Sequence, residues 1–485
     1  MTRTRGSRRS FLRVSAGFVG TIALGVTETS RAGAATPKSS GSGGATGDLA
    51  AWSKVDEIIR RVKAPTFADR QFPITRYGAV ADGKTLCTQA VAATIAACSK
   101  SGGGHVVVPE GTFLTGAVTL KSNVDLHLES GATLKFSTDP ADYPLVYTRW
   151  GGIECYNYSP FIYAFGQKNI GVTGSGTIDG QASEEYWWPW AGEGLYGWKI
   201  GGPTEANDSA LLTRMGATGV PVAERIFGLG HYLPPSFVQP YHSKNVVIEG
   251  IRVINSPFWE LHPVLCTNVT VSGVRVDSLG VNNDGCDPES CRDVLIEKCT
   301  FNTGDDCISP KAGTDADGRR VNVPCQNVVI QNCRFENGHG ALAMGSSTSG
   351  GIRNIFARDL VMTNRNLLDC LRIKTNSSRG GYVEKIYVRD VKVTGVTDSG
   401  LNIDYFYEGG EGDGFNPTVT DIYMRNIHFD EAYRAWSLYG YPDDKIGLVS
   451  MIDCTFDKVH GQHPPRRNVS NFELINVVIE GKKVH

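Results

Sequence analysis

The chain has 485 residues, of which 41% are hydrophobic and 20% are charged, and its formal net charge is −2. These values exclude a chain that is disordered throughout, and the near-neutral charge excludes a nucleic-acid-binding module that works through bulk positive charge. Glycine is the outlier, with 57 residues. Because these glycines follow no collagen-like period, they favour a chain that is rich in strands and tight turns.

The N-terminal segment is typical of a bacterial export signal, although a basic disordered tail is an alternative. Residues 1–13 carry five arginines and no acid, an apolar stretch follows over 14–26, and small residues stand at 32–34. Residues 7–13 resemble a twin-arginine signal. We expect a signal peptide over 1–34, a Gly/Ser-rich linker over 35–48 and a single domain over 49–485. Cleavage would leave a periplasmic or secreted chain with a net charge of −7 and no membrane span.

One nine-residue phrase recurs through the second half of the chain. It begins at Asn245, Asn268, Asp293 and Asn327, and more loosely at Asn354, Lys385, Asp421 and Asn471. The wide gap before the last copy leaves room for a degenerate copy near Ser450. Apolar residues fall at offsets 1 and 3 and again at offsets 6 and 8, so two short strands with a bend between them are predicted.

Residues at the same offset in successive copies would stack as ladders inside a coil of strands. This pattern predicts an all-β chain folded as a right-handed parallel β-helix, whereas a β-sandwich would not keep these offsets while the gaps vary. Residues 49–64 and 88–99 look helical, and we expect them to form a short cap over the N-terminal end. The chain also has twelve cysteines, whose pairing the sequence does not predict.

The longer gaps between copies carry acids and one histidine at matching offsets. Asp305 lies 12 residues after Asp293, and His339 lies 12 residues after Asn327, so adjacent coils would place them one above the other. The neighbouring coils add further polar residues to the same face. The predicted face comprises Asp284, Asp287, Asp305, Asp306, His339, Arg372 and Lys374.

Crowded carboxylates hold at least one proton to a higher pH, and an acid beside a free carboxylate is what glycoside hydrolysis requires. The pair Arg372 and Lys374 would suit an anionic sugar. Taken singly, Asn283-Asp284-Gly285 and the other short motifs are ordinary turn compositions, and clustered aspartates are also typical of a Ca²⁺ site. The interpretation as a catalytic site depends on the stacking of four coils.

Four motifs together resemble glycoside hydrolase family 28, the polygalacturonases. They are Asn282-Asn283-Asp284, Gly304-Asp305-Asp306, Gly338-His339-Gly340 and Arg372-Ile373-Lys374. The resemblance implies an inverting enzyme acting on α-1,4-linked galacturonic acid, with no cofactor and no metal. It implies Asp305 as general acid, and Asp284 and Asp306 as the groups that activate water.

The resemblance also implies that His339 tunes the acid and that Arg372 and Lys374 bind the substrate. We further expect Asn282, Asp287 and Tyr405 to contact the substrate, with Tyr407 as the alternative to Tyr405. The partner would be a pectic polysaccharide or an oligogalacturonide rather than a nucleic acid or a membrane, and we expect a monomer.

Residues 140–235 form a long predicted insert with five tryptophans, which would either wall off one end of the cleft or plug the side of the helix. The chain looks more similar to exo-acting bacterial members, so we expect exo action. Three alternatives remain: a hydrolase of rhamnogalacturonan or another pectic side chain, a Ca²⁺-dependent pectate lyase, and a non-catalytic glycan-binding β-helix.

Overall fold

A computed structural model describes residues 44–409, 412–461 and 465–485 of the chain. The predicted signal peptide therefore lies outside the described residues. Two units are distinguished, Met1–Ser42 and Gly43–His485, and only the second is described below. The linker predicted over 35–48 is too long, because helix α1 (Gly44–Ala51) already includes its last residues. Asp48 in that helix is 1% exposed, and its carboxylate accepts two hydrogen bonds from Arg425, at 2.7 and 3.0 Å.

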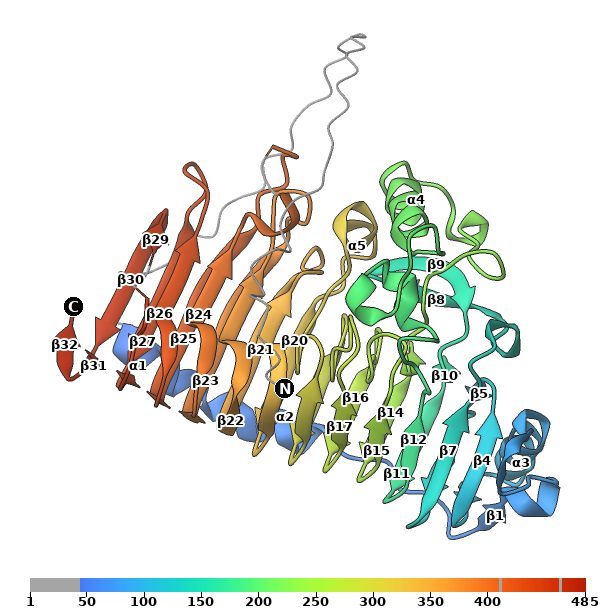
Figure 1. Ribbon diagram of the computed structural model, residues 1–485. Coiled ribbons are helices and arrows are strands. Elements are labelled where there is room, and N and C mark those ends of the chain that lie inside the picture. Colours follow the sequence, from blue (N-terminus) through green and yellow to red (C-terminus); the bar gives the residue numbers. More distant parts are fainter. Residues whose placement is uncertain (1–43, 410–411, 462–464) are drawn as a thin grey trace, which may run out of the picture. The chain divides into compact units, whose positions relative to one another are not determined.

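Parallel strands stack along the second unit, and each strand pairs with its equivalent in the next coil (Figure 1). This pairing confirms the parallel β-helix. The first ladder contains β1 (Gln71–Pro73), β3 (Gly104–Val108), β6 (Val124–Leu128), β11 (Lys168–Gly174), β14 (Lys244–Glu249), β16 (Thr267–Ser272), β18 (Arg292–Glu297), β20 (Cys325–Gln331), β22 (Ile352–Lys374), β23 (Tyr382–Val393), β25 (Thr418–Phe429), β27 (Ile446–Ile452) and β30 (Val469–Ile475).

Two further ladders complete each coil, and the long strands β22, β23 and β25 contribute to more than one ladder. The second contains β2 (Asp82–Leu86), β4 (Gly111–Thr115), β7 (Ala132–Phe136), β12 (Thr177–Asp179), β15 (Arg252–Ile254), β17 (Arg275–Ser278), β19 (Thr300–Thr303), β21 (Arg334–Gly345), β28 (Thr455–Phe456) and β31 (Val477–Ile479). The third contains β5 (Val118–Thr119), β10 (Ile162–Phe165), β13 (Val238–Tyr241), β24 (Val396–Asp404), β26 (Ala432–Tyr439) and β29 (Arg466–Arg467). The last strand, β32 (Lys482–Val484), pairs antiparallel with β31.

The recurring phrase reflects a backbone conformation that is repeated in successive coils. Its first residue is left-handed in the seven copies from Asn245 to Asp421, with φ between 55° and 62°, a region that asparagine and aspartate tolerate. The asparagine side chains also bond from coil to coil: Asn245 donates to Asn169 and Asn268 donates to Asn245, both at 2.7 Å. A second left-handed residue stands five positions after each start, at Gly250 and its equivalents, and confirms the predicted bend.

The predicted ladders of inward residues form the core. Residues at offset 6, from Ile251 to Val477, are at most 3% exposed, and those at offset 8 from Val253 to Phe429 are fully buried. The copy predicted near Ser450 is present as strands β27 and β28. All twelve cysteines lie in the described ranges, and each is buried with a free thiol.

Both predicted helical segments are helical, but only one of them is a cap. Helix α3 (Thr88–Lys100) packs against β1, β3 and β4 at the N-terminal end of the stack (Figure 1). Helices α1 and α2 (Ser53–Arg61) lie instead along the outer face of the first ladder. Trp52 and Ile58 pack there in a cluster with Leu295 and other outward apolar residues, so the capping role predicted for this segment is wrong.

The stretch 140–235 is two insertions separated by a coil, because β10, β11 and β12 belong to the ladders. The first insertion is an antiparallel hairpin of β8 (Leu145–Trp150) and β9 (Ile153–Tyr158). The second contains helix α4 (Ala206–Ala217), which contacts β9 and the short helix α5 (Asp315–Val321). Figure 1 shows these green segments on one side of the stack. None of the helices in the described ranges combines the length and apolar character that a bilayer span requires.

Candidate active site

Three carboxylates meet at the turns that lead into the third ladder. Asp284 lies between β17 and β18, while Asp305 and Asp306 directly follow β19. Backbone hydrogen bonds between the coils set their register, since Gly285 N–H donates to the carbonyl of Asp306 and His339 N–H donates to that of Asp305. One oxygen from each of the three carboxylates lies within 4.8 Å of the others. The predicted stacking of acids on adjacent coils is therefore present.

The three carboxylates differ in exposure. The side chain of Asp305 is 20% exposed, whereas those of Asp284 and Asp306 are 5% and 0% exposed. Of the three, Asp305 is therefore the carboxylate that is partly open to solvent.

Two lysines neutralise the buried acids. Lys374 Nζ donates to Asp306 Oδ2 at 2.5 Å, and Lys311 Nζ donates to Asp284 Oδ2 at 3.0 Å. They occupy matching positions in the coils, three residues after Leu371 and Ile308, which both belong to the third ladder. The chain itself therefore supplies two positive charges, on Lys374 and Lys311, that balance the clustered carboxylates.

Lys311 was missed by the sequence analysis. The available signal was a single charged residue inside a run of small and apolar residues, Cys307-Ile-Ser-Pro-Lys-Ala, that directly follows a pair of aspartates. Such a residue is expected to be buried only if it is paired, and the nearest acids are those of the site.

The acid and the histidine form an ion pair at the mouth of the site. His339 Nδ1 lies 2.9 Å from Asp305 Oδ1. The charge on Asp305 raises the pKa of His339. Burial acts to raise the pKa of Asp305, but the positive charge and hydrogen bond of His339, assisted by Lys374, hold it well below its usual range.

The pKa of Asp284 is shifted in the opposite direction, because here burial outweighs the neighbouring cations. Burial raises the pKa of this carboxyl to about 6, against the attraction of Lys311 and with the repulsion of Asp305. In this geometry the more exposed acid is held ionised by its histidine, while the buried acid retains a proton to mildly acidic pH.

Asp284 and Asp305 line an open cleft of about 380 Å³. Asn282, Lys311, Lys374 and Tyr407 also line it, together with Trp150, Glu205 and Leu212 from the two insertions. Burial, with a contribution from Glu193, raises the pKa of Glu205 to about 8. Trp150 stacks on Phe258, with ring centroids 5.3 Å apart. The insertions therefore form one wall of the cleft, although Trp187 is buried in the core and Trp188 and Trp190 pack against it.

The structure corrects two of the predicted substrate contacts. Asp287 is fully buried, 3.5 Å from Lys311, and does not line the cleft. Tyr405 is also fully buried, and its hydroxyl accepts a hydrogen bond from Val419 N–H at 3.0 Å. Tyr405 therefore belongs to the core, and it is Tyr407, at the start of the short helix over 407–409, that lines the cleft. Arg372 lies beside Tyr407, with the guanidinium carbon 5.9 Å from the ring centroid.

The chain is similar to known proteins over most of its length. The sequence profile of the glycosyl hydrolases family 28 matches residues 230–445. An exopolygalacturonase from Thermotoga maritima is 41% identical in a structural superposition that covers 90% of this chain and 97% of that one, with a TM-score of 0.87.

Curated relatives are more distant. A probable polygalacturonase from Vitis vinifera is 29% identical over 78% of this chain and 72% of its own length. An exo-poly-alpha-D-galacturonosidase from Dickeya chrysanthemi is 27% identical over 70% of this chain and 58% of its own length. With its site geometry and these similarities, the chain belongs to family 28 of the glycosyl hydrolases and is a glycoside hydrolase.

Proposed function

We propose that this enzyme hydrolyses α-1,4-galacturonosidic bonds in polygalacturonan and acts from a chain end. The observation that carries the proposal is the arrangement of one partly exposed and two buried carboxylates beside a pair of cations. Asp305 is the exposed carboxylate and is paired with His339. Arg372 and Lys374 supply the cations.

Asp305 acts as the general acid in this proposal, because it is the carboxylate that a glycosidic oxygen can approach. Its pKa is low in the free enzyme, partly because Lys374 and Arg372 are near. A galacturonate carboxylate bound to these two cations would neutralise them, so the pKa of Asp305 would rise when substrate is present. The proton shared with His339 then becomes available to the leaving oxygen.

Asp284 and Asp306 act as the groups that hold and deprotonate the attacking water. Because both carboxylates are buried, their oxygens are kept away from the anomeric carbon of the bound sugar. This favours water over a carboxylate as the nucleophile. This supports inversion, even though the carboxylates are as close as those of retaining enzymes, which stand about 5 Å apart. Proton NMR of the first-formed product tests the stereochemistry: the inverted anomer is expected, and the retained anomer would overturn the assignment.

An anionic substrate suits the charges of the cleft. Arg372 is able to bind a carboxylate through two parallel hydrogen bonds. Lys374 and Tyr407 lie beside it, with Lys374 Nζ 5.3 Å from the Tyr407 ring centroid. These cations would attract a polyuronate to an enzyme whose exported form has a net charge of −7.

Exo action is supported by the wall that the two insertions build. Trp150, Glu205 and Leu212 stand on the cleft that holds Asp284 and Asp305, so a polymer has less room to extend past the cleavage point. Two of the similar proteins described above are exo-acting by name. As part of the same proposal, the enzyme is exported by the twin-arginine route, residues 1–34 are removed, and the mature chain works as a monomer on pectic polysaccharide outside the cytoplasm.

One digestion tests this function. Polygalacturonate and rhamnogalacturonan are incubated separately with the enzyme, and products are separated by size at early times. We expect monomer or dimer from polygalacturonate and little from rhamnogalacturonan, whereas a ladder of oligomers would contradict exo action. Asp305→Asn should lose at least about 100-fold in rate. A product with chelator-sensitive ultraviolet absorbance would indicate elimination and would overturn hydrolysis.

A further inference from the structure

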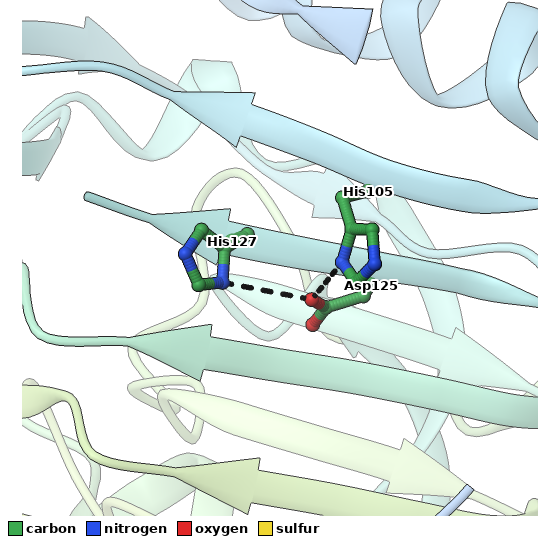
Figure 2. Close-up of side chains that lie close together, drawn as sticks. All are labelled: His105, Asp125 and His127. Carbon is green, nitrogen blue, oxygen red and sulfur yellow. Dashed lines mark hydrogen bonds and ion pairs between the residues drawn. The ribbon is translucent and has the colours of Figure 1, made fainter. Parts of the chain in front are cut away.

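A second cluster of chemistry-bearing side chains lies on the outer face of the first ladder, near its N-terminal end. His105 on β3 and Asp125 on β6 are register partners, and His127 stands two residues after Asp125 on the same strand. The alternating residues Val124, Leu126 and Leu128 are fully buried, so Asp125 and His127 project from the opposite face. Figure 2 shows the carboxylate of Asp125 between the two imidazole rings.

The nitrogens and oxygen converge on one point. His105 Nδ1 lies 2.8 Å and His127 Nδ1 lies 3.7 Å from the same oxygen, Asp125 Oδ2. Tetrahedral zinc, with bonds of about 2.0–2.2 Å to nitrogen and oxygen, places neighbouring ligand atoms about 3.3 Å apart. The observed separations bracket that value, so small side-chain movements would seat a metal ion among the three groups.

Asp125 gives an independent sign of a missing ligand. The residue is 1% exposed, and its second oxygen, Oδ1, has no hydrogen-bond partner among the described residues. Its other oxygen, Oδ2, contacts the two histidines and accepts a hydrogen bond from the hydroxyl of Thr173 at 2.8 Å. A buried carboxylate that lacks a full set of donors or a cation is costly in free energy.

Space for Asp125 is kept by a glycine on the next coil. Gly171 is its register partner, and a β-carbon at this position would lie 2.5 Å from Asp125 Oδ1 and 3.0 Å from the ring of Phe67. Phe67, which precedes β1, also packs edge to face on His105, with ring centroids 5.9 Å apart. The cluster is thus held between the strands and the segment that follows helix α2.

We propose that His105, Asp125 and His127 bind one divalent transition-metal ion of the zinc class. Two imidazoles and a carboxylate are the ligand types that such ions prefer, and the metal would replace the protons that these groups now share with one another and with Thr173. The side chains of His105 and His127 are 30% and 39% exposed, which leaves the ion open to solvent on one side. Bound there, it ties β3 to β6 and stabilises the N-terminal coils.

Metal titration of the full chain tests the proposal. The protein is stripped with a chelator, dialysed and titrated with Zn²⁺ by calorimetry, and with Co²⁺ by visible spectroscopy. We expect one Zn²⁺ per chain, a visible Co²⁺ spectrum of four-coordinate type, and a Zn²⁺-dependent rise in Tm of about 2 °C or more. No saturable binding would overturn the proposal and leave a hydrogen-bonded His–Asp–His group.

Matched variants locate the ion. His127→Gln replaces a partly exposed side chain and Asp125→Asn preserves the shape of a buried one; each should weaken Zn²⁺ binding by at least about 100-fold. His428→Gln changes another group of one histidine and two acids, with Asp430 and Asp457, and should leave binding unchanged. Asp305→Asn should also leave it unchanged. If binding survived His127→Gln but were lost in Asp305→Asn, the ion would belong to the cleft, and the proposal would be wrong.

Discussion

The ammonium group of Lys311 lies 3.0 Å from the carboxylate of Asp284, inside a cleft where that carboxylate is almost completely buried. Burial raises the pKa of this carboxyl and the lysine opposes the rise, so that the pKa is about 6 with the lysine present. Since Asp284 must be ionised to take a proton from water, this contact links a buried lysine to the acidic limit of activity.

Lys311→Met should move that limit to higher pH. Removing the cation takes away the interaction that favours ionised Asp284, so its pKa rises above about 6 and the base is lost at a higher pH than in the wild type. The acidic limb of kcat/KM should shift upward by about one unit or more, as measured by reducing-end assays across pH. Lys385→Met, which changes a lysine with a side chain 42% exposed, is the control. An unmoved limb would show that another group than Asp284 is the base.

His339→Gln should narrow the pH profile of activity by moving its basic limb. The histidine raises the pH at which the His339–Asp305 pair loses its shared proton, because its own pKa is raised by the aspartate. Without it, the proton is held by Asp305 alone, so the basic limb should move toward acidic pH and kcat at neutral pH should fall by about 100-fold. A basic limb that does not move would show that His339 does not control the proton on Asp305.

Tyr407 and Tyr405 offer a matched pair for testing substrate contact. Tyr407→Ala should raise KM for polygalacturonate about 10-fold, because it removes a ring from the wall of the cleft beside Arg372 and Lys374. Tyr405→Phe removes a buried hydroxyl that accepts from Val419 N–H, and should lower stability by about 1–2 kcal/mol without changing KM. The reverse pattern in steady-state kinetics would reinstate Tyr405 as the substrate contact.

Much of this architecture follows from a single pattern in the sequence. Offsets that persist while the gaps vary predict the stacked ladders, and equal offsets of Asp305 and His339 predict that they meet. Both relationships are local, because the register of each coil is set by the residue that begins it. The asparagines that mark these starts are visible in the sequence because few other residues tolerate their backbone conformation.

What the sequence did not predict depends on long-range packing or on side-chain direction. Helix α2 has a strong apolar face, but nothing in its composition tells whether that face covers the end of the stack or the side near Leu295. Tyr405 and Tyr407 share the same side of an extended chain, so alternation alone does not separate them; the short helix at 407–409 turns Tyr407 toward the cleft. Lys311 was hidden because its partner comes from another coil.

A buried ion-pair network beneath the cleft supports a stability prediction. Glu289, fully buried, accepts one hydrogen bond from Arg149 Nη1 at 3.0 Å and pairs with His262 Nε2 at 2.8 Å. Burial acts to raise the pKa of Glu289, but Arg149 and His262 overcome it and lower the pKa to about 2. Because the folded-state pKa lies below the unfolded one, the stability that this carboxylate contributes is present above about pH 4.5 and is lost as the pH falls toward 2.

Glu289→Gln should therefore lower the free energy of unfolding by about 3–5 kcal/mol at neutral pH, since it removes the negative charge 3.0 Å from the fully buried guanidinium of Arg149. The difference from the wild type should shrink between about pH 4.5 and 2, where the wild-type carboxylate itself takes up a proton. Urea unfolding followed by circular dichroism at several pH values measures both effects. Glu57→Gln, at a side chain 64% exposed, is the control and should change stability little. A loss of stability that is the same at every pH would mean that the charge of Glu289 is not what holds this network together.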